Sequence, residues 1–436
     1  MKASRFALTA ALALAWPAAA ADLITVYRDA QVSDPLYQAA RAQHQATVER
    51  LPQARAGYLP QISGSASVFR NHSERGGIPD RDYTTNTFAV TLAQPVFRMQ
   101  NLIAIDQARR VVLQAEAVLA ASHQDLALRV AQAYFDVLLA QDNVSVSETQ
   151  KTAIDQQLAQ AKRNFEVGTA TIVDTLEAQA RYDQSVAKEI ADRNDLEVKR
   201  RALALLLGKT PDGLTPVRDP LTLATPAPND IEAWVKTAVD SSYQVAIAQA
   251  NLDIAEQEVA RQRAGHLPTV DLSGSIARTD NPLAAQAPAS PVGRDASVGL
   301  TLSVPIFSGG LVQSRVREAL ALRERSQQDL EGSQRSVAQQ VRASFLNVTS
   351  GIAQVRALEQ ALVSTQSQLD STVLGRDVGV RTSVDVLNAQ QQVFQTRRDL
   401  QQARYNYLMN TLRLKAAAGQ LNESDVEQVN RALGLG

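Results

Sequence analysis

The amino-acid sequence predicts an α+β membrane protein built from two copies of one unit, each a β-hairpin followed by a long α-helical hairpin. Three observations lead to this fold class. The same glycine and proline punctuation occurs twice, strand-length runs alternate apolar with small polar residues, and the remaining segments are long and free of proline. Together they indicate membrane-length strands joined to helices too long for a compact globular domain.

The duplication is visible as two motifs that recur in the same order. Residues 56–60 read Ala-Gly-Tyr-Leu-Pro and residues 264–268 read Ala-Gly-His-Leu-Pro. A Pro-x-Phe sequence then follows in each copy, within residues 94–97 and 304–307. The copies lie about 210 residues apart, far more than the period of a solenoid. We therefore predict an internal two-fold repeat.

The candidate strands lie between these motifs. Apolar or small side chains alternate with polar or small ones over residues 61–68 and 87–92 in the first copy, and over residues 269–276 and 297–304 in the second. Each run indicates a strand of about ten residues, the length of a tilted strand that crosses a membrane, with one apolar face and one small polar face. Soluble hairpins with one wet face would show the same alternation.

The number of strands bears on this alternative. Two hairpins supply four strands, whereas a closed membrane barrel needs about eight or more. Strands that enter a membrane would therefore have to form a barrel shared between several copies of the chain. Long polar loops, rich in glycine or proline, are expected within the hairpins at residues 71–82 and 279–295.

The proline-free segments predict coiled-coil helices. No proline occurs over residues 96–210 or after Pro305. Gly168 and Gly379 supply the left-handed residue at which a helix can end, so each segment is predicted to be an α-helical hairpin with an arm of roughly 100 Å. The apolar positions recur at near-heptad spacing. They are Val130, Tyr134, Val137 and Val144 in the first copy, and Val341, Phe345, Val348, Ile352, Val355 and Leu362 in the second.

The N-terminus predicts a cleaved secretory signal peptide at residues 1–21. Lys2 and Arg5 precede an apolar run that ends in Pro17 and small residues. The predicted domains are then repeat 1 at 22–210, a connector at 211–229, repeat 2 at 230–419 and a C-terminal tail at 420–436. The β-hairpins are expected at about 61–95 and 269–304, and the α-helical hairpins at about 100–208 and 308–419.

Composition excludes several classes of function. The chain has no cysteine, so it has no disulfide, no thiolate metal site and no lipidated N-terminal cysteine. A net charge of −1 argues against a nucleic-acid partner. After the signal, no stretch of 18 or more apolar residues occurs, so a membrane segment would have to be a β-barrel.

No enzyme, cofactor or metal site is expected, because no phosphate loop or nucleophile motif occurs and the histidines lack metal-ligand spacing. The histidines are His44, His72, His123 and His266.

Five segments closely resemble the TolC family of outer-membrane factors, in the family's order and over essentially the whole mature chain. They are residues 22–27, 265–268, 304–310, 377–387 and 403–408. The resemblance implies a homotrimer in which each chain gives four strands to a twelve-stranded outer-membrane β-barrel, continuous with a periplasmic α-helical coiled-coil barrel. Because it has no cysteine that could be lipidated, the chain resembles the unlipidated, secretion-type branch of the family.

The resemblance also implies a function and partners. The protein would be an exit duct in the outer membrane of a Gram-negative cell, with its helical barrel in the periplasm, serving type I protein secretion or multidrug efflux. Expected partners are outer-membrane lipid, a periplasmic adaptor (membrane fusion) protein and an inner-membrane transporter of the ABC or RND type. The alternative from another class is a periplasmic coiled-coil adaptor or scaffold without a pore, which would not need four membrane-length strands.

A periplasmic gate is implied at the turns of the helical hairpins. Arg381 matches a gate arginine, and Asp174 matches the residue that pairs with it. Arg376 stands where the family has a gate tyrosine, so we expect an ionic link in place of a tyrosine hydrogen bond. Both arginines would alternatively be solvated charges near a helix end.

The pore entrance and the docking tips are implied in the same way. Asp385 matches an entrance aspartate, whose three copies around one axis would attract cations, and Asn388 stands where a second aspartate is usual. The Thr-x-x-Asp spacing at Asp385, as at Asp174, also fits a helix capping box. The expected adaptor docking tips are Val167, Gly168, Val378 and Gly379. The alternative is a plain tight turn, for which glycine is equally suitable.

Overall fold

The computed structural model describes residues 21–76, 78–211, 213–218, 220–281, 292–431 and 433. The predicted signal peptide therefore lies outside the described residues except for Ala21, and so does most of the predicted loop at 279–295. The chain divides into two compact units. Unit 1 comprises Met1–Gln38, His123–Trp234 and Val341–Gly436, and unit 2 comprises Ala39–Ser122 and Val235–Gln340.

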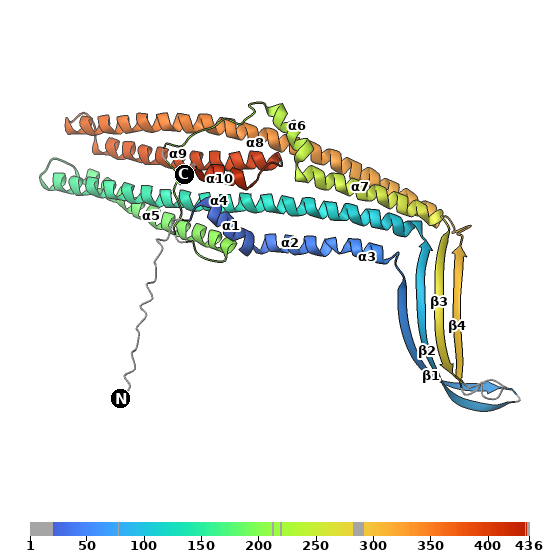
Figure 1. Cartoon of the computed structure of the whole chain (residues 1–436). Coiled ribbons are helices and arrows are strands. Elements are labelled where there is room, and N and C mark those ends of the chain that lie inside the picture. Colours follow the sequence, from blue (N-terminus) through green and yellow to red (C-terminus); the bar gives the residue numbers. More distant parts are fainter. Residues whose placement is uncertain are drawn as a thin grey trace, which may run out of the picture. The chain divides into compact units, whose positions relative to one another are not determined.

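Figure 1 shows the elements in chain order. The first repeat contains α1 (Leu23–Ser33), α2 (Pro35–Val48), α3 (Arg50–Ala56), β1 (Gln61–Arg75), β2 (Ile78–Phe97), α4 (Met99–Glu166) and α5 (Ile172–Leu207). The second contains α6 (Ile231–Ser241), α7 (Tyr243–Arg263), the 3-10 turn η1 (Ala264–His266), β3 (Thr269–Asp280), β4 (Val292–Ser303), α8 (Leu311–Asp377) and α9 (Ser383–Ala417), followed by α10 (Glu423–Arg431).

The strands of unit 2 form one antiparallel sheet in the order β1-β2-β3-β4, so the hairpins of the two repeats pair through β2 and β3. The register aligns the apolar residues of all four strands, as in the row Gly64, Val90, Ile276 and Ala296. Directly paired residues of antiparallel strands project from the same face. The predicted division into an apolar and a small polar face is thus confirmed where the predicted strand runs pair.

The predicted loop at residues 71–82 is wrong. β1 continues to Arg75 and β2 begins at Ile78, because the polar residues of this segment pair across the two strands. His72 is hydrogen-bonded to Asp82 through Nδ1 at 2.9 Å. At the other end, β2 passes Pro95 with a register shift between Pro95 and Phe97, as expected where proline cannot donate to the ladder.

The two predicted α-helical hairpins are present. α4 and α5 contain 68 and 36 residues, and α8 and α9 contain 67 and 35, so the two copies match closely. The predicted seams are buried in unit 1. Only Val144 and Leu362, the last residue of each seam, are half-buried. In the described part of the chain, no helix is long and apolar enough to span a membrane.

Two other helical segments have features that the sequence did not indicate. The helical segment before the second β-hairpin is interrupted after Ser241, where Ser242 caps α7 by accepting a hydrogen bond from the backbone N–H of Gln244. The start of the mature chain, for which the sequence predicted no element, forms α1. Asp22 caps this helix by accepting from the N–H of Thr25, and Asn430 of α10 donates to Asp22 at 2.8 Å.

The core of unit 1 packs around α4, where Tyr134 and Phe135 are both nearly fully buried. The Tyr134 hydroxyl donates to the carbonyl of Thr215 at 3.0 Å and accepts from its N–H at 3.1 Å. Burial raises the pKa of Tyr134, so the phenol stays protonated. The hydrogen bonds hold the connector between the repeats against α4.

An ion pair joins the α1–α2 junction to α4 and gives a testable prediction. The Arg129 guanidinium binds the buried Asp34 carboxylate at 2.8 and 3.2 Å and lowers its pKa below the ordinary 3.8. Asp34→Asn is therefore expected to lower the free energy of unfolding at pH 7 by about 2 kcal/mol. Because the lowered pKa stabilises the fold above pH 3.8, the difference from wild type shrinks as the pH falls through the folded value.

Urea unfolding followed by circular dichroism, at pH 7 and at stepwise lower pH, measures this difference. The matched control is Asp125→Asn, which removes the exposed second carboxylate partner of Arg129 and should cost less. Equal unfolding of Asp34→Asn and wild type at pH 7 would contradict the assigned role of the pair.

Candidate functional site at the helical hairpin tips

The turns that end α4 and α8 have the same backbone geometry. Gly168 and Gly379 adopt φ of +79° and +81°, which L side chains rarely adopt, so the predicted left-handed glycines are confirmed. The Thr169 N–H donates to the Asn164 carbonyl and the Val380 N–H to the Gly375 carbonyl, each at 2.8 Å. These hydrogen bonds reverse the chain tightly at both tips.

Both returning helices start with a capping box. The Thr171 side chain accepts from the N–H of Asp174 at 3.3 Å, and Asp174 accepts from the N–H of Thr171 at 2.9 Å. Thr382 and Asp385 make the same exchange at 3.2 and 2.9 Å. The capping role that the spacing left open is therefore filled by both aspartates, and it fixes the position of each carboxylate at a helix N-terminus.

Arg376 lies at the end of α8 and contacts α4. Its guanidinium forms an ion pair with Asp377 at 2.7 Å and donates to Gln157 at 3.1 Å and to Gln160 at 3.5 Å. Only 17% of the side chain is exposed. Within the described part of this single chain, neither Arg376 nor Arg381 forms an ion pair with Asp174. Arg376 thus links the two hairpins through amide groups.

Arg381 folds back over the end of α8. A Cβ added to Gly375 would meet the Arg381 Cγ at 2.8 Å, so the glycine leaves room for the arginine stem. The N–H of Arg381 also donates to the Gly375 carbonyl at 3.1 Å. The exposed guanidinium lies close enough to the Asp385 carboxylate to help lower its pKa. The Thr382 backbone N–H is the main cause of the lowered pKa of Asp385, followed by the Thr382 side chain and Arg381. Asp385 is therefore ionised at neutral pH.

Asn388 is held by a residue that the sequence did not single out. Arg181 of α5 donates through Nη2 to the Asn388 side-chain oxygen at 3.2 Å and through Nη1 to Gln391 at 3.0 Å. A weaker ion pair joins Arg181 to Glu177 at 4.0 Å. The signal available in the sequence was spacing, since Arg181 follows Asp174 by two helical turns and so lies on the same face of α5. The Arg181 guanidinium thus lies next to Asn388, the position where the resemblance leads one to expect a second entrance aspartate.

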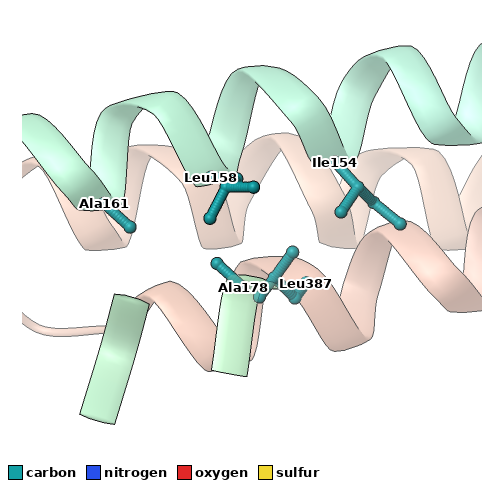
Figure 2. Packing of buried hydrophobic residues seen from close by; sticks show 5 residues of the cluster. All are labelled: Ile154, Leu158, Ala161, Ala178 and Leu387. Carbon is teal, nitrogen blue, oxygen red and sulfur yellow. The ribbon is translucent and has the colours of Figure 1, made fainter. Parts of the chain in front are cut away.

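A small apolar cluster packs α4, α5 and α9 together near the tips (Figure 2). Ile154, Leu158 and Ala161 of α4 point toward Ala178 of α5 and Leu387 of α9, and all five are buried. Their burial fixes the start of α5 and α9 against the end of α4. This packing holds the candidate gate residues in a defined arrangement.

The tips also carry exposed apolar side chains. Val167 is 73% exposed and Val378 is 66% exposed, and each is next to a tip glycine. Further exposed apolar residues of the two tips are Phe165, Ile172, Val173, Leu176, Leu374 and Val380. Exposed apolar side chains gathered on one surface are typical of a contact with another protein.

Possible metal donors come together at a different place. The pairing of β1 with β2 brings His72 close to Glu74 and Asp80, although their spacing gave no signal. All three residues are exposed, and both ring nitrogens of His72 already contact carboxylates, Asp82 at 2.9 Å and Glu74 at 3.2 Å. These contacts between exposed charged side chains explain why the three residues lie together.

Comparison with known proteins gives consistent matches. Residues 26–209 and 234–420 match the family described as outer membrane efflux protein. The chain is 33% identical to outer membrane protein TolC of Vibrio cholerae, over 95% of this chain and 94% of that protein. It is 32% identical to the alkaline protease secretion protein AprF of Pseudomonas aeruginosa, over 93% of this chain and 86% of that protein. The crystal structure of outer membrane protein VceC from Vibrio cholerae has the same fold, with a TM-score of 0.78 and 20% identity over 91% of this chain and 96% of VceC.

Proposed function

The chain belongs to the outer membrane efflux protein family, and we propose that it is an exit duct of the outer membrane for type I protein secretion or multidrug efflux. It lies in the outer membrane with its helical part in the periplasm. Relatives of this chain are named as the alkaline protease secretion protein AprF and as the outer membrane efflux protein BepC of Brucella suis, so secretion and efflux both occur by name among similar chains.

The two faces of the sheet are the observation that carries this proposal. On one face Val90, Ile276 and Val298 are more than half exposed, which suits contact with lipid. On the other face Ser63 is hydrogen-bonded to Thr91 and Ser275 to Ser297, so this face is small and polar, as the lining of a water-filled pore requires. A scaffold without a pore has no use for such a sheet.

We propose a homotrimer as the working form. The outer strands β1 and β4 each have a pairing partner on one side only within the described residues. Their free backbone groups would be costly in lipid, and pairing β4 of one chain with β1 of the next removes both edges. Three chains would give a closed barrel of twelve strands, continuous with the helical hairpins.

The gate is proposed to lie at the hairpin tips of the trimer. Arg376, with its contacts to Gln157 and Gln160, supports the closed packing of α8 against α4. Arg381 is exposed, and its guanidinium is proposed to pair with Asp174 of a neighbouring chain. Opening would then require these polar links to be exchanged for contacts with a partner.

The partners proposed are a periplasmic adaptor and an inner-membrane transporter of the ABC or RND type. The exposed valines of the two tips, Val167 and Val378, support the adaptor contact. The adjacent Gly168 and Gly379 have no heavy atom within 4 Å of an added Cβ, so the turns are open and no neighbouring side chain would obstruct another helical hairpin there.

Membrane extraction tests the proposed function against the scaffold alternative. Membranes from cells that express the chain are washed with alkaline carbonate and with urea, and the outer membrane is then separated by density. A duct stays in the outer-membrane fraction under both washes, because its strands are embedded in lipid. Release of the folded chain by carbonate would favour the soluble scaffold.

The entrance charge gives a second testable prediction. Asn388→Asp alone is expected to change divalent-cation block of the pore by less than about twofold, because the new carboxylate would be paired with Arg181. Asn388→Asp combined with Arg181→Gln should lower the half-blocking cation concentration by about tenfold, since a second ring of free carboxylates then faces the axis. Conductance with stepwise addition of divalent cations on the side of the tips measures the block.

Asp385→Asn provides the matched loss of charge and should abolish the block. Because the pKa of Asp385 is below its ordinary 3.8, the block of the wild-type pore should persist to pH 4 and disappear only as the carboxylate protonates at lower pH. Block that is unchanged in Asp385→Asn would refute the entrance assignment.

A further inference from the structure

Two arginines face each other on the otherwise apolar face of the sheet. Arg278 of β3 and Arg294 of β4 are direct cross-strand partners, and Arg278 is also the partner of Phe88 in β2, which pairs with Ala66 in β1. Directly paired residues share a face, so all four side chains lie on the same face as Val90 and Ile276. This row lies toward the Asp280 end of β3 and the Val292 end of β4, away from the strand ends that join the helices.

The two positive charges have no counter-charge on the described part of the chain. Neither Arg278 nor Arg294 forms an ion pair or a side-chain hydrogen bond there, and both are exposed. Asp280 lies one row further out on the same face and pairs with neither. Like charges placed directly opposite each other on a sheet are unfavourable. An anion from outside the chain would remove this repulsion.

A shallow groove runs along the sheet from the arginines. A hollow of about 620 Å³ is bounded by Phe88, Val90 and Ile276, with Arg278 and Arg294 at one end. Gly64 forms part of its floor, and a Cβ added there would have no heavy atom within 4 Å. The hollow is apolar along its length and charged at its end.

A second hollow continues the first toward the helices. It has a volume of about 450 Å³, and Val90 and Ile276 line both hollows. Leu92 and Gly274 line its far part, four residues along β3 from Arg278, so the arginines stand roughly 13 Å from this part of the groove. This distance is that of an extended medium-length acyl chain, not of a free inorganic anion.

We propose that this surface binds a lipid whose headgroup carries phosphate, with the phosphate between Arg278 and Arg294 and an acyl chain in the groove. Guanidinium groups bind phosphate oxygens in bidentate fashion, and two of them can bind the oxygens of one phosphate together. The inference rests on the proposed function, which puts this face in lipid and the Asp280 end of β3 and the Val292 end of β4 near the outer headgroup layer. Arginine on a lipid-facing strand is tolerated at that depth.

Lipid binding to the purified, detergent-solubilised protein tests the proposal. Native mass spectrometry would compare dilauroyl phosphatidylglycerol, which is anionic, with dilauroyl phosphatidylcholine, which is zwitterionic and has the same chains. Arg278→Gln with Arg294→Gln should weaken phosphatidylglycerol binding at least about tenfold. The control is Arg325→Gln with Arg335→Gln, two exposed arginines of α8, which makes the same change in net charge and should leave binding unchanged.

Two further arms separate the headgroup from the groove. Gly64→Leu fills the groove without changing charge, and it should weaken binding of the lipid but not of inorganic phosphate. Inorganic phosphate alone should compete poorly with phosphatidylglycerol. If phosphate displaces the lipid as readily as added lipid does, or if Gly64→Leu binds lipid like wild type, the site is a simple anion site and the lipid assignment is wrong.

Conductance of the same variants distinguishes a failure of this inference from a failure of the proposed function. Arg278→Gln with Arg294→Gln should conduct like wild type, because both residues lie on the face away from the pore. If the wild type conducts but binds phosphatidylglycerol no more tightly than this double variant does, the lipid site alone is refuted. A wild type that does not enter membranes overturns the proposed function. If the double variant fails to assemble, the single substitutions are measured in its place.

Discussion

Replacing both arginines of the candidate gate, Arg376→Ala with Arg381→Ala, is expected to raise the single-channel conductance several-fold. The double variant removes the links of Arg376 to Gln157 and Gln160, as well as any pairing of Arg381 with a neighbouring chain. These losses amount to about 2–3 kcal/mol, most of it from the largely buried Arg376. A closed-to-open equilibrium would then shift by roughly 30- to 150-fold.

Planar-bilayer recordings of the purified variant measure this shift. The control is Arg325→Ala with Arg335→Ala, which removes two arginines from exposed i,i+4 pairs of the same helix, α8. The control should conduct like wild type. A conductance that is equal in wild type and in Arg376→Ala with Arg381→Ala would rule out the proposed gate, because the closed state would then not depend on these side chains.

Placing a charge on both tips, Val167→Asp with Val378→Asp, is expected to abolish export while leaving assembly intact. Both valines are exposed, so the folded chain tolerates a carboxylate there. In a docked complex the same carboxylates would be buried without partners, at a cost of about 4 kcal/mol for the two positions. This corresponds to a loss of adaptor affinity of roughly a thousandfold.

Export of a cargo protein and crosslinking to the adaptor measure the docking. The substitutions leave Gly168 and Gly379 in place, so the left-handed turns are not disturbed. Val32→Asp is the matched control, because Val32 of α1 is 78% exposed and lies away from the tips in sequence. Normal export by the tip variant, with assembly confirmed, would contradict the proposed docking surface.

Much of the fold could be predicted because it follows from local patterns. The alternation of Val90 with Thr91 and of Ile276 with Ser275 fixes the faces of the strands, and the register of the sheet then keeps them aligned. The glycines at 168 and 379 end the long helices for a reason visible in the sequence, since only glycine readily adopts a positive φ. The heptad positions around Val130 and Val341 are buried because apolar side chains at this spacing form one seam along the helix.

Features that depend on contacts between distant segments could not be predicted. α1 packs against α5 and α10, with the Leu23 N–H donating to Asn430 at 3.0 Å, a contact across the whole chain. The strands extend past residue 71 because polar residues pair across the hairpin, whereas polar composition alone suggested a loop. The link from Arg181 to Asn388 joins the two repeats, so neither copy shows it by itself.

Several copies of this chain are expected to form a water-filled duct whose narrow end lies at the helical tips. Single-channel recording of the purified oligomer, with divalent cations added on the side of the tips, tests it most directly. Small, steady conductance steps that the cations block are expected, with the block lost in Asp385→Asn and larger steps in Arg376→Ala with Arg381→Ala. A folded oligomer that gives no steps, in the wild type and in this gate variant alike, would contradict it.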